Sequence, residues 1–201
     1  VAGINPEPTL KTVNDLTSTI RQCQAECVVA VGGGSVIDVA KTAALLSQQQ
    51  IWDVTAYHRD AQPLTGTGLP MFAAPTTSGT GAEITKNAVL TDPETDCKRS
   101  IRSEAMIPRA AIIDPALTLS LPLPQTIYSG MDALTQAIES YLSRNATHHS
   151  RALAGEAVSL LLPQLPDAPT RLDDLSFRAS LAQGSMLCAM AFAQSSLGAV
   201  H

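Results

Sequence analysis

The spacing of apolar residues predicts alternating helices and strands in the first part of the chain. After a proline-rich entry, apolar positions at near-helical intervals predict a surface helix over Thr9–Gln24. The run Cys27–Val31 is short, continuous and rich in valine, which predicts a fully buried strand. Helical spacing then predicts a second helix over Ser35–Gln48. The order is therefore a strand, a glycine turn and a helix, as in a parallel α/β sheet.

The next elements are shorter and continue the α/β pattern. A second apolar strand is predicted over Pro70–Ala74, and a loop rich in Gly, Thr and Ser, Ala74–Thr85, follows it. Asn87–Ile101 is predicted as two strands joined by a turn at Asp92-Pro93. A last strand is predicted over Ala110–Ile113, where an Asp-Pro pair ends it.

From residue 122 onward only helical periods remain. Helices are predicted over Gln125–Ser143, His149–Leu162 and Leu172–Val200, with Gly184 as a candidate break in the last of them. Prolines mark the connection before the last helix. We therefore predict two domains, an α/β domain over residues 1–121 and an all-helical domain over residues 122–201.

Composition narrows the class of protein. The chain has 201 residues, of which 45% are apolar and 15% charged, enough for a sizeable core. A net charge of −5 and the absence of a Lys/Arg run argue against a nucleic-acid partner. The apolar stretch Ser185–Val200 carries Gln194, Ser195 and Ser196, so we predict a buried helix there and no membrane span. These observations favour a protein that acts on small molecules.

The cysteines and the chain ends bear on the setting of the protein. The four cysteines contain no CxxC pair, which favours a reducing compartment, and we expect the cytoplasm. We interpret all four as packing residues: Cys23, Cys27, Cys97 and Cys188. The chain begins with valine, shows no signal peptide and ends at His201 without a closing loop, which indicates a segment of a longer protein.

Three consecutive glycines, Gly32, Gly33 and Gly34, separate the first strand from its helix. In parallel sheets, ligands bind beyond the carboxyl ends of the strands, where helix amides and the helix dipole favour a phosphate. Glycine allows the close backbone approach that such a site needs. The triplet predicts a pyrophosphate site, although it matches neither GxGxxG nor GxxxxGKS. The alternative is a tight strand-to-helix turn with Ser35 as the N-cap.

The loop after the second strand repeats this arrangement. Its hydroxyl residues would add donors around the same ligand: Thr76, Thr77, Ser78 and Thr80. Two loops of this kind favour a ligand site over two purely structural turns. On the first glycine-led helix, Asp38 and Lys41 lie three positions apart, and we interpret them as a surface ion pair of little energetic value.

Four motifs make the sequence similar to a known family. VAVGGGSVIDVAK, APTTSGTGAEIT, IIDPALTLSLP and GMDALTQAIESY resemble, in order and spacing, the iron-containing alcohol dehydrogenase family across nearly the whole chain. The resemblance implies a Rossmann-like, dehydroquinate synthase-like α/β domain that binds NAD or NADP. It implies a following all-helical domain that holds a divalent metal, Fe²⁺ or Zn²⁺. It also implies further strands before Val1 and further helices after His201.

The resemblance assigns cofactor contacts to both loops. Together with their neighbours in the loops, the matching positions give this candidate cofactor set: Gly32, Gly33, Gly34, Ser35, Asp38, Thr76, Thr77, Ser78, Thr80, Asn87 and Lys98. Asn87 and Lys98 resemble polar contacts to the ribose and phosphate part of the cofactor. For Lys98 the alternative is a solvated lysine on a strand.

The resemblance also implies a metal site, with one departure. Asp132 matches a metal ligand of the family, and His201 matches the first of two later histidine ligands. The ligand four residues after Asp132 is normally histidine, on the same helix face, but this chain has Gln136. A neutral amide oxygen is a weaker ligand than imidazole for Fe²⁺ or Zn²⁺. The candidate metal residues are Asp132, Gln136 and His201.

These polar residues also have ordinary structural interpretations. Asp132 suits the first turn of a helix, and Gln136 suits a buried, hydrogen-bonded amide. Glu139 shares the helix face of Asp132 and is predicted to make an ordinary polar contact. The remaining histidines are predicted to lie in solvent: His58, His148 and His149.

The function implied by the resemblance is hydride transfer between NAD(P) and a small alcohol or its aldehyde or ketone, assisted by a divalent metal. Gln136 leaves open a metal-independent member of the same superfamily. The incomplete ligand set leaves open an inactive nucleotide-binding fragment. The expected partner is a small alcohol or aldehyde, and homo-oligomerisation is common in the family.

Overall fold

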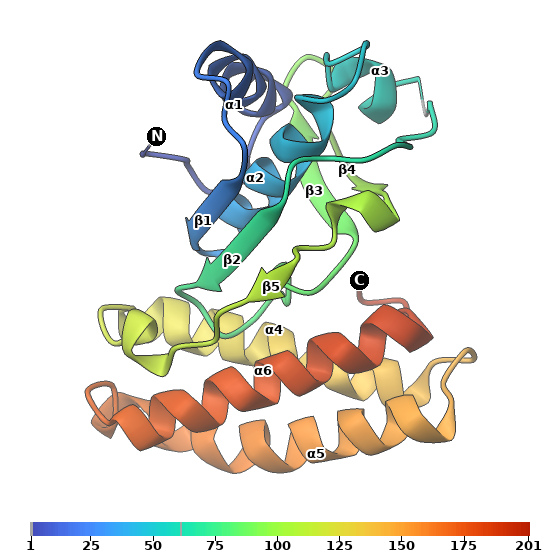
Figure 1. Ribbon diagram of the computed structural model, residues 1–201. Helices are drawn as coiled ribbons and strands as arrows, with labels where there is room; N and C mark the ends of the chain where they lie inside the picture. Colours follow the sequence, from blue (N-terminus) through green and yellow to red (C-terminus); the bar gives the residue numbers. More distant parts are fainter. Residues whose placement is uncertain (1, 61) are drawn as a thin grey trace. The chain divides into compact units, whose positions relative to one another are not determined.

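The computed structural model describes residues 2–60 and 62–201, which form two compact units (Figure 1). The first unit comprises the chain up to Ala74 together with Lys86–Ile112. The second unit comprises Pro75–Thr85 and Ile113–His201. Each unit has a hydrophobic core of its own.

The first unit has an α/β fold. Its elements, in chain order, are α1 (Leu10–Gln22), β1 (Val28–Gly32), α2 (Gly34–Leu46), α3 (Thr55–His58), β2 (Met71–Pro75), β3 (Asn87–Asp92), β4 (Cys97–Arg102), η1 (Glu104–Met106) and β5 (Ala110–Ala111). The first sheet has the order β1-β2-β5, and β2 pairs in parallel with β5, with Phe72 opposite Ala110. The predicted strands and helices of this half are confirmed.

Local chemistry explains where these elements begin and turn. The Thr9 side chain caps α1 by accepting the Thr12 amide, and the apolar face of the helix lies in the core. The predicted hairpin is confirmed: β3 and β4 pair antiparallel, from Asn87 opposite Arg102 to Asp92 opposite Cys97. The Asp-Pro turn therefore joins two strands in register.

The burial predicted for β1 is wrong. Val29 and Val31 are 62% and 56% exposed, whereas Ala30 and Gly32 are buried. Side chains alternate across a strand, so Ala30 and Gly32 share one face and the two valines share the other. A continuous valine run predicts burial on both faces, but only one face of β1 is buried here.

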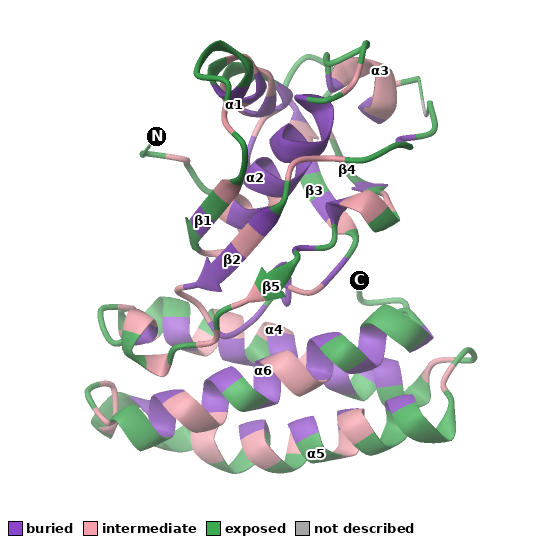
Figure 2. Cartoon of the chain, viewed as in Figure 1, coloured by how far each residue is buried: buried purple, intermediate pink, exposed green. Residues whose placement is uncertain are grey.

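The second unit is helical. Its elements are η2 (Pro115–Thr118), α4 (Leu123–Leu142), α5 (His148–Gln164), η3 (Leu165–Thr170) and α6 (Leu175–Ser195). The three long helices pack against one another around Ala133, Leu161 and Phe177 in one cluster and around Ala137 and Cys188 in another. Figure 2 marks buried positions along all three helices.

The candidate break at Gly184 is absent, because α6 is continuous from Leu175 to Ser195. A Cβ atom on Gly184 would lie 2.7 Å from the Leu161 side chain of α5. Glycine therefore serves close packing of two helices at this position and does not end the helix.

The compact units divide the chain differently from the predicted domains, 1–121 and 122–201. The loop Pro75–Thr85 belongs to the helical unit, and that unit resumes at Ile113. The reason is packing: Cβ atoms on Gly79 and Gly81 would lie 2.8 Å from Ser129 and 2.2 Å from Ala189. The domain limits stay a prediction.

The cysteines and the last apolar stretch have mixed outcomes. Cys188 is buried as expected, but Cys23 and Cys27 are exposed, so the packing interpretation is wrong for these two. Most of the apolar stretch forms the end of α6, and Ser195 is fully buried. Across the described part of the chain, no helix has the length and apolarity of a membrane span.

Candidate functional site

The N-terminus of α2 begins directly after β1. Gly33 is the N-cap in an extended conformation, the helix starts at Gly34, and none of the described side chains caps it. The alternative with Ser35 as N-cap is therefore wrong, because Ser35 lies in the first turn. A Cβ atom on Gly32 would lie 2.6 Å from Val36, so glycine is needed where the strand turns into the helix. Backbone donors at an uncapped helix start favour an anion.

Asp38 and Lys41 form a buried ion pair, and the surface pair predicted from the sequence is wrong. The Lys41 Nζ lies 2.9 Å from Asp38 Oδ1, with side-chain exposures of 0% and 14%. Asp38 Oδ2 accepts the amide of Val89 at 2.9 Å. The carboxylate of Asp38 thus joins α2 to β3.

The other two candidate cofactor residues of the first unit lie on the hairpin. Asn87 begins β3, and Lys98 lies on β4. The Lys98 ammonium lies 3.1 Å from the Glu7 carboxylate, and both side chains are more than half exposed. Such a pair in solvent contributes little to stability, so Lys98 is available for another partner.

The hydroxyl residues of the loop Pro75–Thr85 differ in burial. Thr76 and Thr77 are half-buried, Ser78 is buried and Thr80 is exposed, with its hydroxyl accepting the Ala82 amide at 3.3 Å. A cavity of about 10 Å³, room for one water molecule, lies beside Thr77 and Ser78. The buried Ser185 Oγ also lines this cavity and has no hydrogen-bond partner among the described residues.

The metal candidates of the second unit lie on α4 and at the end of the chain. His201 Nε2 lies 3.1 Å from Asp132 Oδ1. The other ring nitrogen, Nδ1, makes a short contact with Oε2 of Glu139. The structure therefore brings together Asp132 and His201, which are 69 positions apart, and adds Glu139 to them.

The electrostatics of this cluster follow from those contacts. Partial burial opposes protonation of the imidazole, but hydrogen bonds to Asp132 and Glu139 raise the pKa of His201 above its usual value. Burial likewise opposes ionisation of Glu139, but His201 and the Val200 amide hold the pKa of Glu139 below its usual value. The two carboxylates beside the imidazole make a positive charge favourable at this position.

Gln136 is buried, with 5% of its surface exposed. The contacts of His201 described above are with Asp132 and Glu139 and not with Gln136. The Oε1 of Gln136 lies 3.8 Å from the Cys188 thiol, which donates to it. Burial and the charge of Asp132 raise the pKa of the thiol, so Cys188 stays protonated. Gln136 therefore matches its interpretation as a buried, hydrogen-bonded amide.

Asp132 and His201 are suited to act as two ligands of a divalent metal. A carboxylate oxygen and an imidazole nitrogen are ligands that Fe²⁺ and Zn²⁺ accept, and Asp132 and His201 present one of each. Within residues 2–60 and 62–201, no group of three His, Cys, Asp or Glu side chains is arranged to hold a metal ion.

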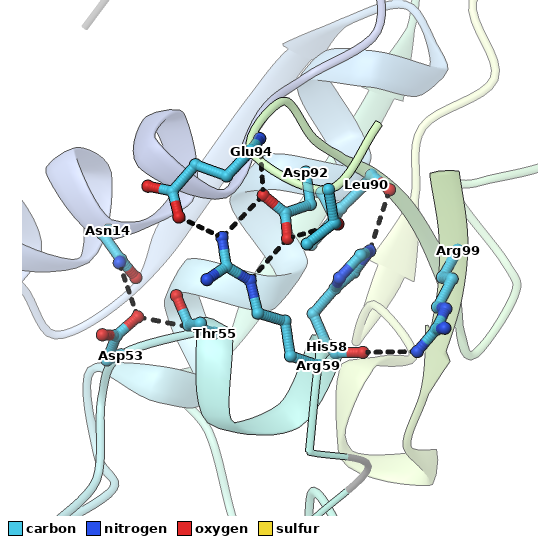
Figure 3. A network of polar contacts seen from close by, with 10 residues as sticks. Asn14, Asp53, Thr55, His58, Arg59, Leu90, Asp92, Glu94 and Arg99 are labelled. Carbon is cyan, nitrogen blue, oxygen red and sulfur yellow. Dashed lines mark hydrogen bonds and ion pairs between the residues drawn. The ribbon is translucent and has the colours of Figure 1, made fainter. Parts of the chain in front are cut away.

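His58 is another departure from the sequence-based expectation, while His148 and His149 are exposed as predicted. His58 is only 3% exposed, and its Nε2 lies 3.1 Å from the Leu90 carbonyl (Figure 3).

Next to His58, Arg59 forms two hydrogen bonds with Asp92 and one with Glu94. Hydrogen bonds from Arg59 hold the pKa of Asp92 well below its usual range. These contacts hold α3 against β3, so we interpret the network as a structural part of the first unit.

The fold and these residues define a protein with an α/β unit, a helical unit, a helix start that none of the described side chains caps, and a carboxylate–histidine pair. The family described as "Iron-containing alcohol dehydrogenase" matches residues 1–115, and "Fe-containing alcohol dehydrogenase family, C-terminal" matches residues 126–201. The chain belongs to the iron-containing alcohol dehydrogenase family. The resemblance seen in the motifs is thereby confirmed.

Individual relatives agree with this assignment. The chain is 35% identical over 200 residues to 1-propanol dehydrogenase PduQ of Citrobacter freundii, covering 100% of this chain and 50% of that protein. It is 38% identical to long-chain-alcohol dehydrogenase 1 of Geobacillus thermodenitrificans over 202 residues, covering 98% of this chain and 49% of that protein. The chain thus spans about half the length of these relatives.

A solved structure shows the same fold. Sulfoacetaldehyde reductase from Bifidobacterium kashiwanohense, crystallised in complex with NAD⁺, matches with a TM-score of 0.95 and 34% identity. The match covers 100% of this chain and 53% of that one. The predicted fold class, a parallel α/β region followed by a helical region, is confirmed.

Proposed function

We propose that the protein is an NAD(P)-dependent oxidoreductase that interconverts a small alcohol and its aldehyde or ketone by hydride transfer. The observation that carries the proposal is the start of α2, where Gly33 and Gly34 follow β1 and none of the described side chains caps the helix. That arrangement suits the diphosphate of a dinucleotide. Family membership and the NAD⁺ complex of a relative support the choice of cofactor.

Each candidate cofactor residue has a role in this proposal. The amides at Gly33, Gly34 and Ser35 bind the diphosphate, and Gly32 keeps the strand end free of a side chain. Lys98 and Asn87 contact the ribose and phosphate part of the cofactor. Asp38 holds α2 to β3 through Val89 and so fixes the direction of the amides.

The hydroxyl groups of the loop Pro75–Thr85 are the second set of cofactor contacts in the proposal. Thr76 and Thr77 are partly exposed and Thr80 is exposed, so their hydroxyl groups can donate or accept hydrogen bonds toward the cofactor. Ser78 is buried, so its hydroxyl supports the loop from inside.

Asp132 and His201 would hold the divalent metal, Fe²⁺ or Zn²⁺. When bound, the metal acts as a Lewis acid on the oxygen of the alcohol or aldehyde. The residues of the chain supply the two ligands, their orientation and the packing of α4 that keeps Asp132 in place. Gln136 stays a candidate ligand in this proposal, and its hydrogen bond with Cys188 would have to break first.

A second candidate is a metal-independent member of the same superfamily. The observation that favours it is Gln136, which stands at a histidine position of the family motif and is already hydrogen-bonded in the core. Metal removal separates the two candidates. If metal-stripped protein keeps its turnover and Fe²⁺ or Zn²⁺ does not raise it, the metal-independent alternative is correct.

The proposal is tested by following NADH or NADPH formation from 1-propanol at several chain concentrations. Activity that requires a nicotinamide cofactor and that Gly34→Val abolishes supports the proposal. Cofactor binding without turnover supports an inactive nucleotide-binding fragment. Turnover or binding that Gly34→Val leaves unchanged contradicts the assignment of the glycine turn.

A further inference from the structure

We propose that Glu139 is a positioning residue that fixes the tautomer and orientation of the His201 imidazole, so that Nε2 faces Asp132. The inference rests on the proposed function, in which Asp132 and His201 are metal ligands. It assigns a role to a residue that the sequence motif alone marks as an ordinary polar contact.

Glu139 and Asp132 lie on the same face of α4. Glu139 lies seven positions after Asp132, so both side chains project from the same helix face. Its side chain is 10% exposed, and its carboxylate lies against Nδ1 of His201. Asp132 lies against the other ring nitrogen at 3.1 Å. One helix face therefore holds both edges of the imidazole.

Glu139 also fixes the backbone that carries His201. Its Oε1 accepts the Val200 amide at 2.7 Å. A Cβ atom on Gly198 would lie 2.8 Å from the same oxygen, so the chain passes the carboxylate closely at a glycine. The Glu139 carboxylate therefore contacts the backbone at Gly198 and Val200 as well as the ring of His201.

The chemistry of the contact determines the tautomer. An ionised carboxylate only accepts hydrogen bonds, so Nδ1 carries a hydrogen atom in the contact with Glu139. Asp132 makes the same demand on Nε2, but Glu139 makes the closer contact. The one hydrogen atom of the neutral imidazole therefore stays on Nδ1, and the lone pair is on Nε2, the nitrogen that lies next to Asp132. Carboxylates that accept a hydrogen bond from a metal-binding histidine act in this way, and their loss costs about 10–100-fold in metal affinity.

The test combines nitrogen NMR of His201 with Zn²⁺ titration of the full chain. The spectra are recorded at alkaline pH, where the imidazole is neutral, and circular dichroism checks folding. We compare Glu139→Ala and Glu139→Gln, and Glu156→Ala serves as a control at an exposed position of α5. Glutamine keeps an acceptor oxygen near Nδ1 and loses only the charge.

The expected result is an Nδ1–H tautomer in the natural chain and a shift toward Nε2–H in Glu139→Ala. Zn²⁺ affinity should fall about 10–100-fold in that variant. Glu139→Gln should restore the tautomer and most of the affinity, and Glu156→Ala should change neither. An Nε2–H tautomer in the natural chain overturns the proposal, even if the alanine variant fails to fold. An unchanged tautomer together with an unchanged Zn²⁺ affinity in Glu139→Ala would also overturn the proposal.

The outcomes separate this inference from the proposed function. An Nδ1–H tautomer that depends on Glu139, in a chain that binds no Zn²⁺, supports the positioning role and contradicts the metal site. Zn²⁺ binding that needs Asp132 and His201 but not Glu139 supports the metal site and contradicts the positioning role.

Discussion

A Cβ atom on Gly81 would lie 2.2 Å from the Cβ of Ala189, so the loop Pro75–Thr85 meets α6 where only glycine fits. Gly81 also has a φ of +64°, in the left-handed region that disfavours other residues. Both constraints act on the loop that carries the second set of candidate cofactor residues. Its shape therefore depends on the helical unit.

Gly81→Ala should lower the free energy of unfolding by about 2–4 kcal/mol, from backbone strain and overpacking together. Urea unfolding measures the change. Gly155→Ala on α5 is the control: apart from its chain neighbours and the nearby backbone of its own helix, no described atom lies within 4 Å of its Cβ position, so it should stabilise by about 0.5–1 kcal/mol. Adding Ala189→Gly to Gly81→Ala should recover the steric part, and the absence of any recovery would contradict the proposed packing.

Asp38→Ala should destabilise the protein by about 3–5 kcal/mol, because it removes the carboxylate beside the fully buried Lys41 ammonium. Asp38→Asn should cost less, since its side-chain oxygen still accepts the Val89 amide. The exposed Lys11–Asp15 pair provides the control, and Asp15→Ala should cost at most about 1 kcal/mol. Equal effects of Asp38→Ala and Asp15→Ala in chemical unfolding would refute the buried pair.

Asp92 should make the stability of the protein sensitive to acid. Hydrogen bonds from Arg59, with help from Thr95, hold the folded-state pKa of Asp92 below the unfolded value of about 3.9. The carboxylate therefore stabilises the fold above that pH, and this contribution is lost as the pH falls toward the lowered pKa. Asp92→Asn should be less stable at neutral pH and should lose less stability on acidification.

The measurement is the free energy of unfolding between about pH 6 and pH 3 for the natural chain and the variant. Asp15→Asn, at a pair that lies in solvent, serves as the matched control variant. Parallel curves for the natural chain and Asp92→Asn would show that Asp92 carries no such linkage.

Element types were predictable from the sequence because local spacing determines them. The helices of both units and the hairpin at Asp92-Pro93 follow from period, turn residues and caps. Burial was less predictable, since it depends on neighbours distant in sequence. Val29 is exposed, whereas His58 and Lys41 are buried against residues of β3 or of α2 itself.

The candidate site was predictable only in part. The glycine turn follows from its position between a strand and a helix, but the link between Asp132 and His201 came from motif resemblance, since no local spacing relates residues 69 positions apart. Glu139 was missed as a partner of His201. The signal was present in Asp132, Gln136 and Glu139, which repeat along one helix face at i, i+4 and i+7.

In the proposed function, the amides at the start of α2 bind a dinucleotide. The most direct measurement is an amide NMR titration of the full chain with NAD⁺ and, separately, NADP⁺. We predict saturable shifts centred on Gly33, Gly34 and Ser35 that Gly34→Val removes. Saturable binding that leaves these three amides unshifted would contradict the account.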